Sequence, residues 1–552
     1  MDHDSPSSPT AALPPKLPPS TPTSVVLSIL RGNTEVEPQL RGELERSIAS
    51  STEGLARYDK RKLPLSADEG RAREALWYYR ESCDSALRSP IRRLPNELLA
   101  SVFELAGDEG VPFIAKPDGK KEITRLGRGQ LLDWAKVCAR WHDIVLHTPS
   151  LWSHITINID LLVDQHSHPG TCETLLLAAL ERSQNLPLRV RVSARNRSAE
   201  HSTRLLRILA DQAGRWTAAA LGISPSLLES MALKGKLPRL QKLFLHTPGG
   251  RSREWLAIDS FSVLPSLQLF SVAGNLRTIP TSLPWGQLME FMFYAGDNTP
   301  TDVEDFASLP LKFLRRGASV SINTKFFWHP APPNPEPLTV TITSLDLALR
   351  IENAPGASNE VVVEQILSHL ELPQLKTLSI GPRFQCPPEG MPAWSYSGFA
   401  DLARRSQFAV SLVKLSVLCA VLPSELLQSL EELPVLEELH LKDIPSRIVI
   451  DDDLLQHLQL SPKPQDSDRL AEVSNTQRRL IPRLGILGLA MPIGLHVTMN
   501  ALRAFVENRI ERGEFEGFFN LRVDLSPVSS EPLQRTLREL VEQYPAFKVV
   551  VQ

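Results

Sequence analysis

The sequence predicts a mixed α/β protein, in which a helical N-terminal part precedes an irregular array of strands and helices. Three observations support this prediction. Apolar residues follow helical spacing before about residue 155, a different apolar pattern recurs after it, and helical stretches separate the copies of that pattern. At 552 residues the chain is also longer than one hydrophobic core usually supports, so we expect at least two units.

Composition and charge narrow the possible functions. Hydrophobic residues make up 42% and charged residues 22%, as in water-soluble globular proteins. The formal net charge of −3 argues against a general nucleic-acid binder, which needs a basic surface. No apolar run is long enough to span a membrane. The five cysteines are scattered without a Cys-x-x-Cys pair, and the N-terminus lacks a signal peptide's pattern. We therefore expect a chain of the cytoplasm, the nucleus or both.

Two segments precede the most informative part of the sequence. Residues 1–38 are rich in Pro, Ser and Thr and are expected to form a disordered tail. An apolar patch at 25–30 within it is interpreted as a partly ordered turn or as a docking peptide. Residues 39–89 have helical spacing in two stretches. These helices either brace the next domain or pair as a short coiled coil.

The next segment, residues 90–155, has the pattern of two helices and a short closing element. Pro95 suits the first turn of a helix, where its missing N–H would be unpaired anyway. Glu97 places a carboxylate near the positive end of the helix dipole. A polar, basic insertion at 107–130, read as a solvated loop or a basic recognition loop, separates this helix from a second helical run at 131–145. The apolar stripe of the first helix comprises Leu98, Leu99, Val102, Phe103 and Ala106.

Three motifs in this segment, in this order, resemble an F-box. They are Leu94-Pro95-x-Glu97-Leu98-Leu99, Val137-Cys138-x-Arg140-Trp141 and Pro149-Ser150-Leu151-Trp152. With the preceding Ser89-Pro90-Ile91-Arg92-Arg93, the segment is similar to the F-box-like proteins of mushroom-forming (basidiomycete) fungi. Without the motif order, an ordinary three-helix bundle with an internal stripe would explain the same residues.

The resemblance implies docking to a Skp-type adaptor and, through it, to a cullin ubiquitin ligase. Carried over by position, Leu94, Pro95, Leu98 and Leu99 meet the adaptor. A further set either lines that contact or holds the three helices together: Val102, Val137, Cys138 and Trp141. Such a contact buries an aliphatic and aromatic surface, with a few anchors carrying most of the affinity.

The pattern that recurs after residue 155 places apolar residues at offsets 0, 3, 6 and 8, as in Leu237, Leu240, Leu243 and Leu245. Regular copies also begin at 264, 372, 433 and 481. The final step of two indicates a strand, and the steps of three fit a turn feeding it. A turn, strand and helix in repeating order is the pattern of leucine-rich repeats, which must stack to cover their apolar faces. We therefore predict an irregular leucine-rich-repeat solenoid over 156–552, with surface loops at 331–337 and 461–479.

No catalytic motif or phosphate-binding loop is present in the sequence. His166, His168 and Cys172 lie close together, but without a second ligand cluster they do not predict a metal site. We expect no enzyme activity, cofactor or metal. The hypothesis is a substrate-recognition subunit of a Skp-cullin-F-box ligase that also binds an unknown target protein. The alternative is a leucine-rich-repeat interaction scaffold without ligase activity, and a hydrolase with scattered catalytic residues ranks third.

Overall fold

The protein forms two compact units. Unit 1 comprises residues 1–111, 119–157 and 166–186, and unit 2 comprises 112–118, 158–165 and 187–552. The structure, a computed structural model, describes residues 22–32, 36–60, 66–88, 91, 94–107, 129–159, 169–194, 200–246, 258–275, 279–296, 301, 309–327, 337–352, 359–383, 386–444, 447–460, 480–492, 496–513, 519–525 and 531–551.

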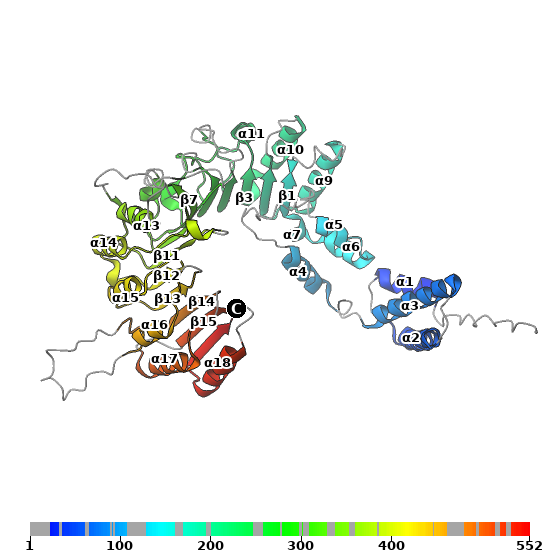
Figure 1. The fold of residues 1–552 in the computed structure, drawn as a ribbon. Helices are drawn as coiled ribbons and strands as arrows, with labels where there is room; N and C mark the ends of the chain where they lie inside the picture. Colours follow the sequence, from blue (N-terminus) through cyan, green and yellow to red (C-terminus); the bar gives the residue numbers. More distant parts are fainter. Residues whose placement is uncertain are drawn as a thin grey trace, which may run out of the picture. The chain divides into compact units, whose positions relative to one another are not determined.

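Unit 1 begins with three helices that share a small apolar core (Figure 1). They are α1 (Thr23–Gly32), α2 (Pro38–Asp59) and α3 (Ala67–Arg88). The buried side chains of this core are Val26, Ile29, Leu44, Cys83 and Ala86. Burial of this apolar area holds the three helices together, because short helices are marginal on their own.

The structure corrects the expectation of a disordered tail over 1–38. Residues 23–32 form α1, and the side chain of Val26 is fully buried. The apolar residues at 25–30 pack against the neighbouring helices. The surrounding prolines and serines give no indication of this packing. The rest of that segment up to residue 21 lies outside the described residues.

The second half of unit 1 contains five further helices and one short strand. They are α4 (Asn96–Gly107), α5 (Gly129–Trp134), α6 (Ala139–His147), α7 (Pro149–Trp152), β1 (His154–Asn158) and α9 (Pro169–Arg182). The single helical run expected at 131–145 is therefore two helices, α5 and α6, with a turn between them. Of the expected insertion at 107–130, residues 108–128 lie outside the described residues.

The expected boundary after residue 155 is also misplaced. Helix α9 belongs to unit 1, where Ala179 joins the apolar core that contains Trp152 of α7. The guanidinium of Arg182 lies over the Trp152 ring, 4.6 Å from its centroid. The apolar contact and the cation–π contact attach α9 to the helices that precede it.

Unit 2 contains a parallel sheet whose strands follow one another in sequence order, with β8 and β10 pairing separately. The strands are β2 (Leu188–Ser193), β3 (Trp216–Gly222), β4 (Lys242–His246), β5 (Leu269–Gly274), β6 (Glu290–Ala295), β7 (Ser319–Phe327), β8 (Leu338–Thr339), β9 (Ser344–Glu352), β10 (Leu370–Glu371), β11 (Thr377–Pro382), β12 (Lys414–Val417), β13 (Glu438–Lys442), β14 (Ile486–Met491), β15 (Phe519–Leu525) and β16 (Phe547–Val551).

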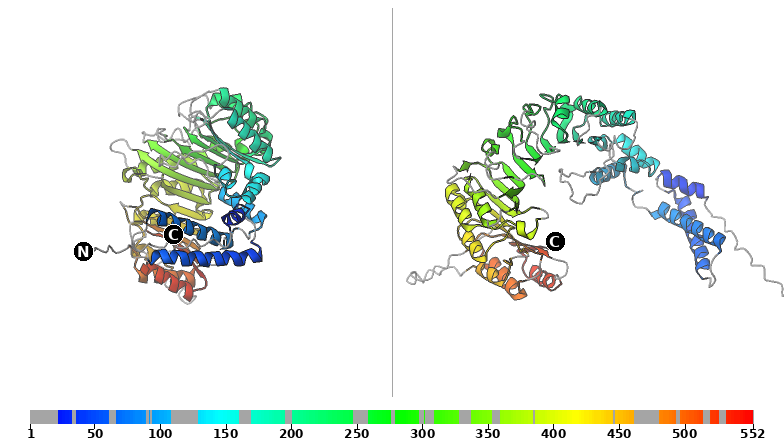
Figure 2. Two further views of the ribbon diagram at one scale, coloured as in Figure 1. Left: turned by 90° about the vertical axis from the view of Figure 1, so that its right-hand side faces the viewer. Right: turned by 45° about the horizontal axis from the view of Figure 1, so that its top comes forward.

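Helices connect these strands along one face of the sheet, which is the outer face of its curve (Figure 1 and Figure 2). They are α10 (Glu200–Ala210), α11 (Pro225–Ser230), α13 (Asn359–Ser368), α14 (Tyr396–Ser406), α15 (Pro423–Glu431), α16 (Asp452–His457), α17 (Met499–Arg512) and α18 (Glu531–Gln543).

The core of unit 2 contains the apolar residues of the recurring pattern. In the five regular copies, every residue at offsets 0, 3, 6 and 8 is at most 3% exposed. The last two of each copy lie within a strand, as Leu243 and Leu245 do in β4. The expected loops at 331–337 and 461–479 lie outside the described residues, apart from residue 337.

Among the helices that the structure describes, none is both long and apolar enough to cross a membrane. The described residues also contain no group of three or more His, Cys, Asp or Glu side chains placed to hold a metal ion.

Candidate functional site

The start of α4 is held in place by an arginine from α6. The Arg140 guanidinium donates through Nε to Asn96 Oδ1 at 2.8 Å, and its Nη2 donates to the carbonyl of Leu94. The Leu99 N–H donates to the Pro95 carbonyl at 3.0 Å, so the helix begins at Asn96 and Pro95 directly precedes it. The sequence places Arg140 in the second motif but assigns it no role. Its role in positioning α4 becomes visible only where α6 contacts the start of α4.

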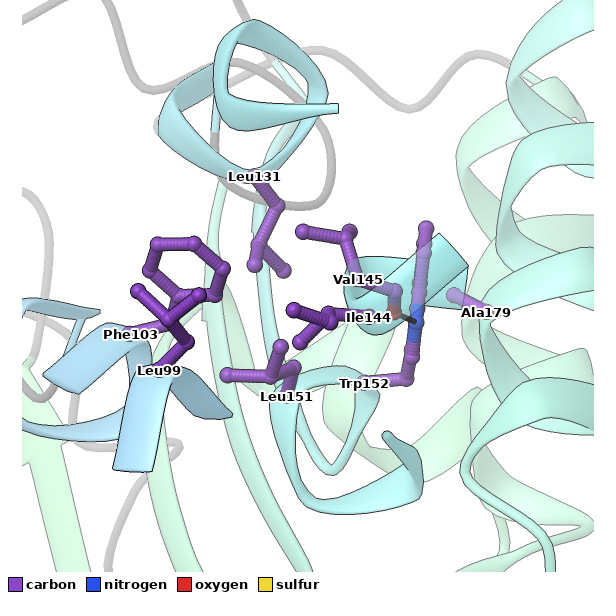
Figure 3. Close-up of a cluster of buried hydrophobic side chains, with 8 residues drawn as sticks. All are labelled: Leu99, Phe103, Leu131, Ile144, Val145, Leu151, Trp152 and Ala179. Atoms are coloured by element: carbon purple, nitrogen blue, oxygen red, sulfur yellow. Dashed lines mark hydrogen bonds between the residues drawn. The ribbon is translucent and has the colours of Figure 1, made fainter. Parts of the chain in front are cut away.

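One side of α4 faces the apolar core of this part of unit 1. Leu99 and Phe103 point towards residues of α5, α6 and α7 (Figure 3). The Phe103 ring stacks on Trp134 with centroids 5.1 Å apart and meets Trp141 edge-on at 4.8 Å. The buried members of this core are Leu99, Phe103, Leu131, Ile144, Val145, Leu151, Trp152 and Ala179. These contacts fix which face of α4 points outward.

One hydrogen bond caps the start of α6, and another attaches α7 to α6. The Cys138 sulfur accepts from the Trp141 N–H at 3.4 Å, which caps the N-terminus of α6. The Trp152 Nε1–H donates to the Val145 carbonyl at 2.7 Å and attaches α7 to α6. Cys138 is 7% exposed and therefore has a structural role in this unit.

A second side of α4 carries large apolar side chains that are exposed. Leu98 is 52% exposed, Val102 44% and Leu105 79%. Their spacing of four and three residues places them on one face of the helix. Val137, in the turn between α5 and α6, is 57% exposed. We call Leu98, Val102 and Leu105 the α4 face. Contiguous exposed apolar side chains of this kind mark interaction sites in folded proteins.

The eight residues that the sequence predicts for adaptor contact differ in their exposure to solvent. Those open to a partner are Pro95, Leu98, Val102 and Val137. Leu94 and Trp141 are partly buried, and Leu99 and Cys138 are buried inside unit 1. Sequence reasoning missed Leu105, although its position seven residues after Leu98 is a signal for the same helix face.

Of His166, His168 and Cys172, which the sequence does not predict to form a metal site, the structure describes Cys172. Cys172 is buried on α9, and burial raises the pKa of its thiol, which the neighbouring Glu173 carboxylate raises further. His166 and His168 lie outside the described residues.

The arrangement around α4 is suited to binding a partner through apolar contact.

Residues 91–158 match the model of the F-box-like family. The chain carries an F-box-like domain. The matched residues begin just before α4 and end with β1, so the domain includes the α4 face, the α5–α6 turn and the core beneath them.

A comparison with solved structures finds several similar chains. A chain from the crystal structure of the Rad7 and Elc1 complex in yeast matches at 13% sequence identity, over 80% of this chain and 96% of that chain, with a TM-score of 0.27. No curated protein matches this chain.

Proposed function

We propose that this protein is a substrate-recognition subunit of a Skp-cullin-F-box ubiquitin ligase. The observation that carries the proposal is the F-box-like domain at 91–158 whose first helix exposes the α4 face. In this role the domain docks a Skp-type adaptor, which links the chain to a cullin. The preceding Ser89-Pro90-Ile91-Arg92-Arg93 further favours a domain of the basidiomycete fungal type.

The α4 face supplies what an adaptor interface needs. Burying one large aliphatic side chain completely stabilises a complex by about 1.5–3 kcal/mol, so three half-exposed ones contribute a few kcal/mol at most. Val137 and Pro95 extend the apolar surface, and Arg140 fixes the approach of the chain to α4. A cluster of anchors on one rigid helix is the arrangement that concentrates affinity in interfaces.

We infer that unit 2 is an irregular leucine-rich-repeat solenoid and that it binds the target. Its parallel strands in sequence order, its buried repeat residues and its helices on one face support this inference. The protein then does no chemistry itself. It raises the effective concentration of a target near a ubiquitin-loaded enzyme. We place this function in the cytoplasm or the nucleus.

Co-purification of the full chain with a Skp-type adaptor from a basidiomycete fungus tests the proposal. The test variant is Leu98→Glu with Val102→Glu, which places two charges on the α4 face. The matched control is Leu177→Glu on α9, because Leu177 is 52% exposed, like Leu98.

We expect the native chain and the control to bind the adaptor, and the double variant to lose at least about a hundredfold in affinity. A folded native chain that fails to bind would remove the ligase assignment. The interaction scaffold without ligase activity would then be the better account of the same repeats.

A further inference from the structure

The sheet face of unit 2 that lies opposite its helices gathers charged side chains on neighbouring strands. Parallel pairing places Lys414 of β12 beside Glu438 of β13, and Gly488 of β14 between His440 of β13 and Arg522 of β15. Alternate residues of a strand point to the same side, so these side chains share one face.

Three cationic or titratable groups from three strands converge on one carboxylate oxygen. Glu438 Oε1 lies 3.0 Å from Lys414 Nζ, 2.6 Å from His440 Nε2 and 3.7 Å from Arg522 Nη1. The Glu438 side chain is only 18% exposed, whereas that of Arg522 is 52% exposed and that of Lys414 34%. The largely buried Glu438 carboxylate therefore holds the cationic groups together, and Lys414 and Arg522 remain accessible to solvent on their other sides.

Gly488 makes this convergence possible. A Cβ atom at this position would lie 2.1 Å from Nδ1 of His440, so the imidazole occupies the space over the glycine. The ring is thereby held across β14, with its other nitrogen on Glu438. The position of His440 is set by packing as well as by charge.

The surroundings add further positive charge. Lys442 follows His440 on the same face of β13, and Lys548 of β16 pairs in register with Asn520 of β15. Asp524 of β15 adds a negative charge to the same face. Fixed positive charges thus outnumber negative ones in this part of the face, even though the whole chain has a formal net charge of −3.

We propose that Lys414, His440 and Arg522, here called the cationic patch, bind an anionic side chain in an extended segment of the target protein. The recognised chemistry is an oxyanion, either a phosphate ester or a cluster of carboxylates. Arginine and lysine pair with both, and charge-assisted hydrogen bonds of this kind are about twice as strong as neutral ones. The proposal rests on the proposed function, in which unit 2 binds the target.

A protein segment fits the patch better than a nucleic acid does. Binding to nucleic acid depends on many phosphate contacts along a continuous basic surface. Here carboxylates of Glu290, Asp346 and Asp524 interrupt the same sheet face. A peptide with one phosphate or a short acidic run needs only the local cluster.

The test measures binding of the full chain to synthetic fluorescein-labelled peptide pools by fluorescence anisotropy. The pools have degenerate flanks around a fixed phosphoserine, a fixed pair of glutamates or a fixed serine, and a single-stranded oligonucleotide serves as competitor. The test variant is Lys414→Gln with Arg522→Gln. The matched control is Lys242→Gln on β4 with Arg404→Gln on α14, which removes the same charges elsewhere in unit 2.

We expect the native chain and the control to bind one of the anionic pools better than the serine pool. The test variant should lose at least about tenfold in that affinity. Preference for phosphoserine over glutamate would identify the anion as a phosphate, and the reverse would identify it as carboxylate. Equal binding of all three pools, or complete displacement by the oligonucleotide, would overturn the proposal.

A second variant guards against a loss caused by misfolding. Glu438→Gln removes the negative charge inside the cluster while leaving the three surrounding groups, so anionic peptides should bind at least as tightly as to the native chain. A folded Glu438→Gln variant that no longer binds would contradict the proposal. These assays contain no adaptor, so failure of peptide binding is distinguishable from failure of the F-box-like domain to bind its adaptor.

Discussion

At the scale of single residues, Arg140 connects the first two of the three motifs that carry the F-box-like pattern. Its guanidinium donates to the Leu94 carbonyl and to Asn96 Oδ1, which lie at the start of α4. This start precedes the α4 face, so a side chain that does not need to touch the adaptor still sets the geometry that the adaptor meets. Arg140 is therefore a positioning residue.

Arg140→Met should loosen the start of α4, because the partly buried Leu94 carbonyl and the exposed Asn96 side chain lose their donor, at about 0.5–1.5 kcal/mol for each hydrogen bond. Hydrogen exchange at the Leu99 amide, which bonds to the Pro95 carbonyl, should become faster. Arg182→Met is the control, since Arg182 stacks on Trp152 in the same unit. Unchanged exchange at Leu99 in Arg140→Met would contradict the positioning role.

Glu438 makes stability depend on pH. Its burial raises the pKa of the carboxyl, but hydrogen bonds from His440 and Lys414 outweigh burial and hold the pKa below its ordinary value. A depressed pKa in the fold means that this stabilisation is present above the ordinary carboxyl pKa and is lost as pH falls through the lowered one.

Between about pH 6 and pH 3, the free energy of unfolding of the native chain should therefore fall more steeply than that of Glu438→Gln. Chemical denaturation followed by circular dichroism at each pH measures this difference. Parallel pH profiles for the two proteins would show that Glu438 contributes no such stabilisation.

At the scale of elements, α14 approaches α13 closely at Gly398. A Cβ atom added there would lie 2.9 Å from Cα of Glu364 and 3.3 Å from its Cβ. The Gly398 N–H also donates to the Ser395 hydroxyl, which caps the helix. Because the obstacle is backbone, the helices cannot accommodate a larger residue by a side-chain rotation.

Gly398→Ala should lower the free energy of unfolding by about 1–3 kcal/mol, the usual cost of overpacking. Gly70→Ala on α3 is the control, because a Cβ there would meet no atom within 4 Å. That partly exposed helical position should gain up to about 1 kcal/mol from the higher helix propensity of alanine. Equal thermal stability of the two variants would contradict this account of the α13–α14 contact.

The sequence predicted elements well where one periodicity dominates. The strands of unit 2 follow from buried residues two apart, and α4 follows from its apolar stripe. It did not predict which side of α4 would be exposed, because Leu98 and Leu99 are chemically identical neighbours. Packing of Phe103 against Trp134 and Trp141 decides that question.

Other elements depended on contacts that local patterns do not record. Helix α6 begins after the break from α5 with Cys138 as its N-cap, although cysteine is not among the residue types that favour this position. Helix α1 depends on its packing with residues of α2 and α3. The cationic patch joins Lys414 and Arg522, which parallel register brings together from distant parts of the sequence.

At the scale of the whole molecule, the two proposed binding sites lie in separate units with separate cores. Substitutions that share no partners usually have additive effects. The Lys414→Gln, Arg522→Gln variant should therefore keep native affinity for the adaptor. The Leu98→Glu, Val102→Glu variant should likewise keep native affinity for the anionic peptide pool. Titrations of each variant with both ligands test this independence, and a cross effect above about threefold would contradict it.

Site-specific crosslinking shows directly whether the α4 face docks a Skp-type adaptor. A photoreactive benzoylphenylalanine replaces Leu105, Val137 or, as control, Leu177, and the full chain is irradiated with the adaptor. Leu105 is the most exposed of the three at 79%. We expect adaptor crosslinks from positions 105 and 137 and none from 177. Crosslinks absent from 105 and 137, or equally strong from 177, would contradict it.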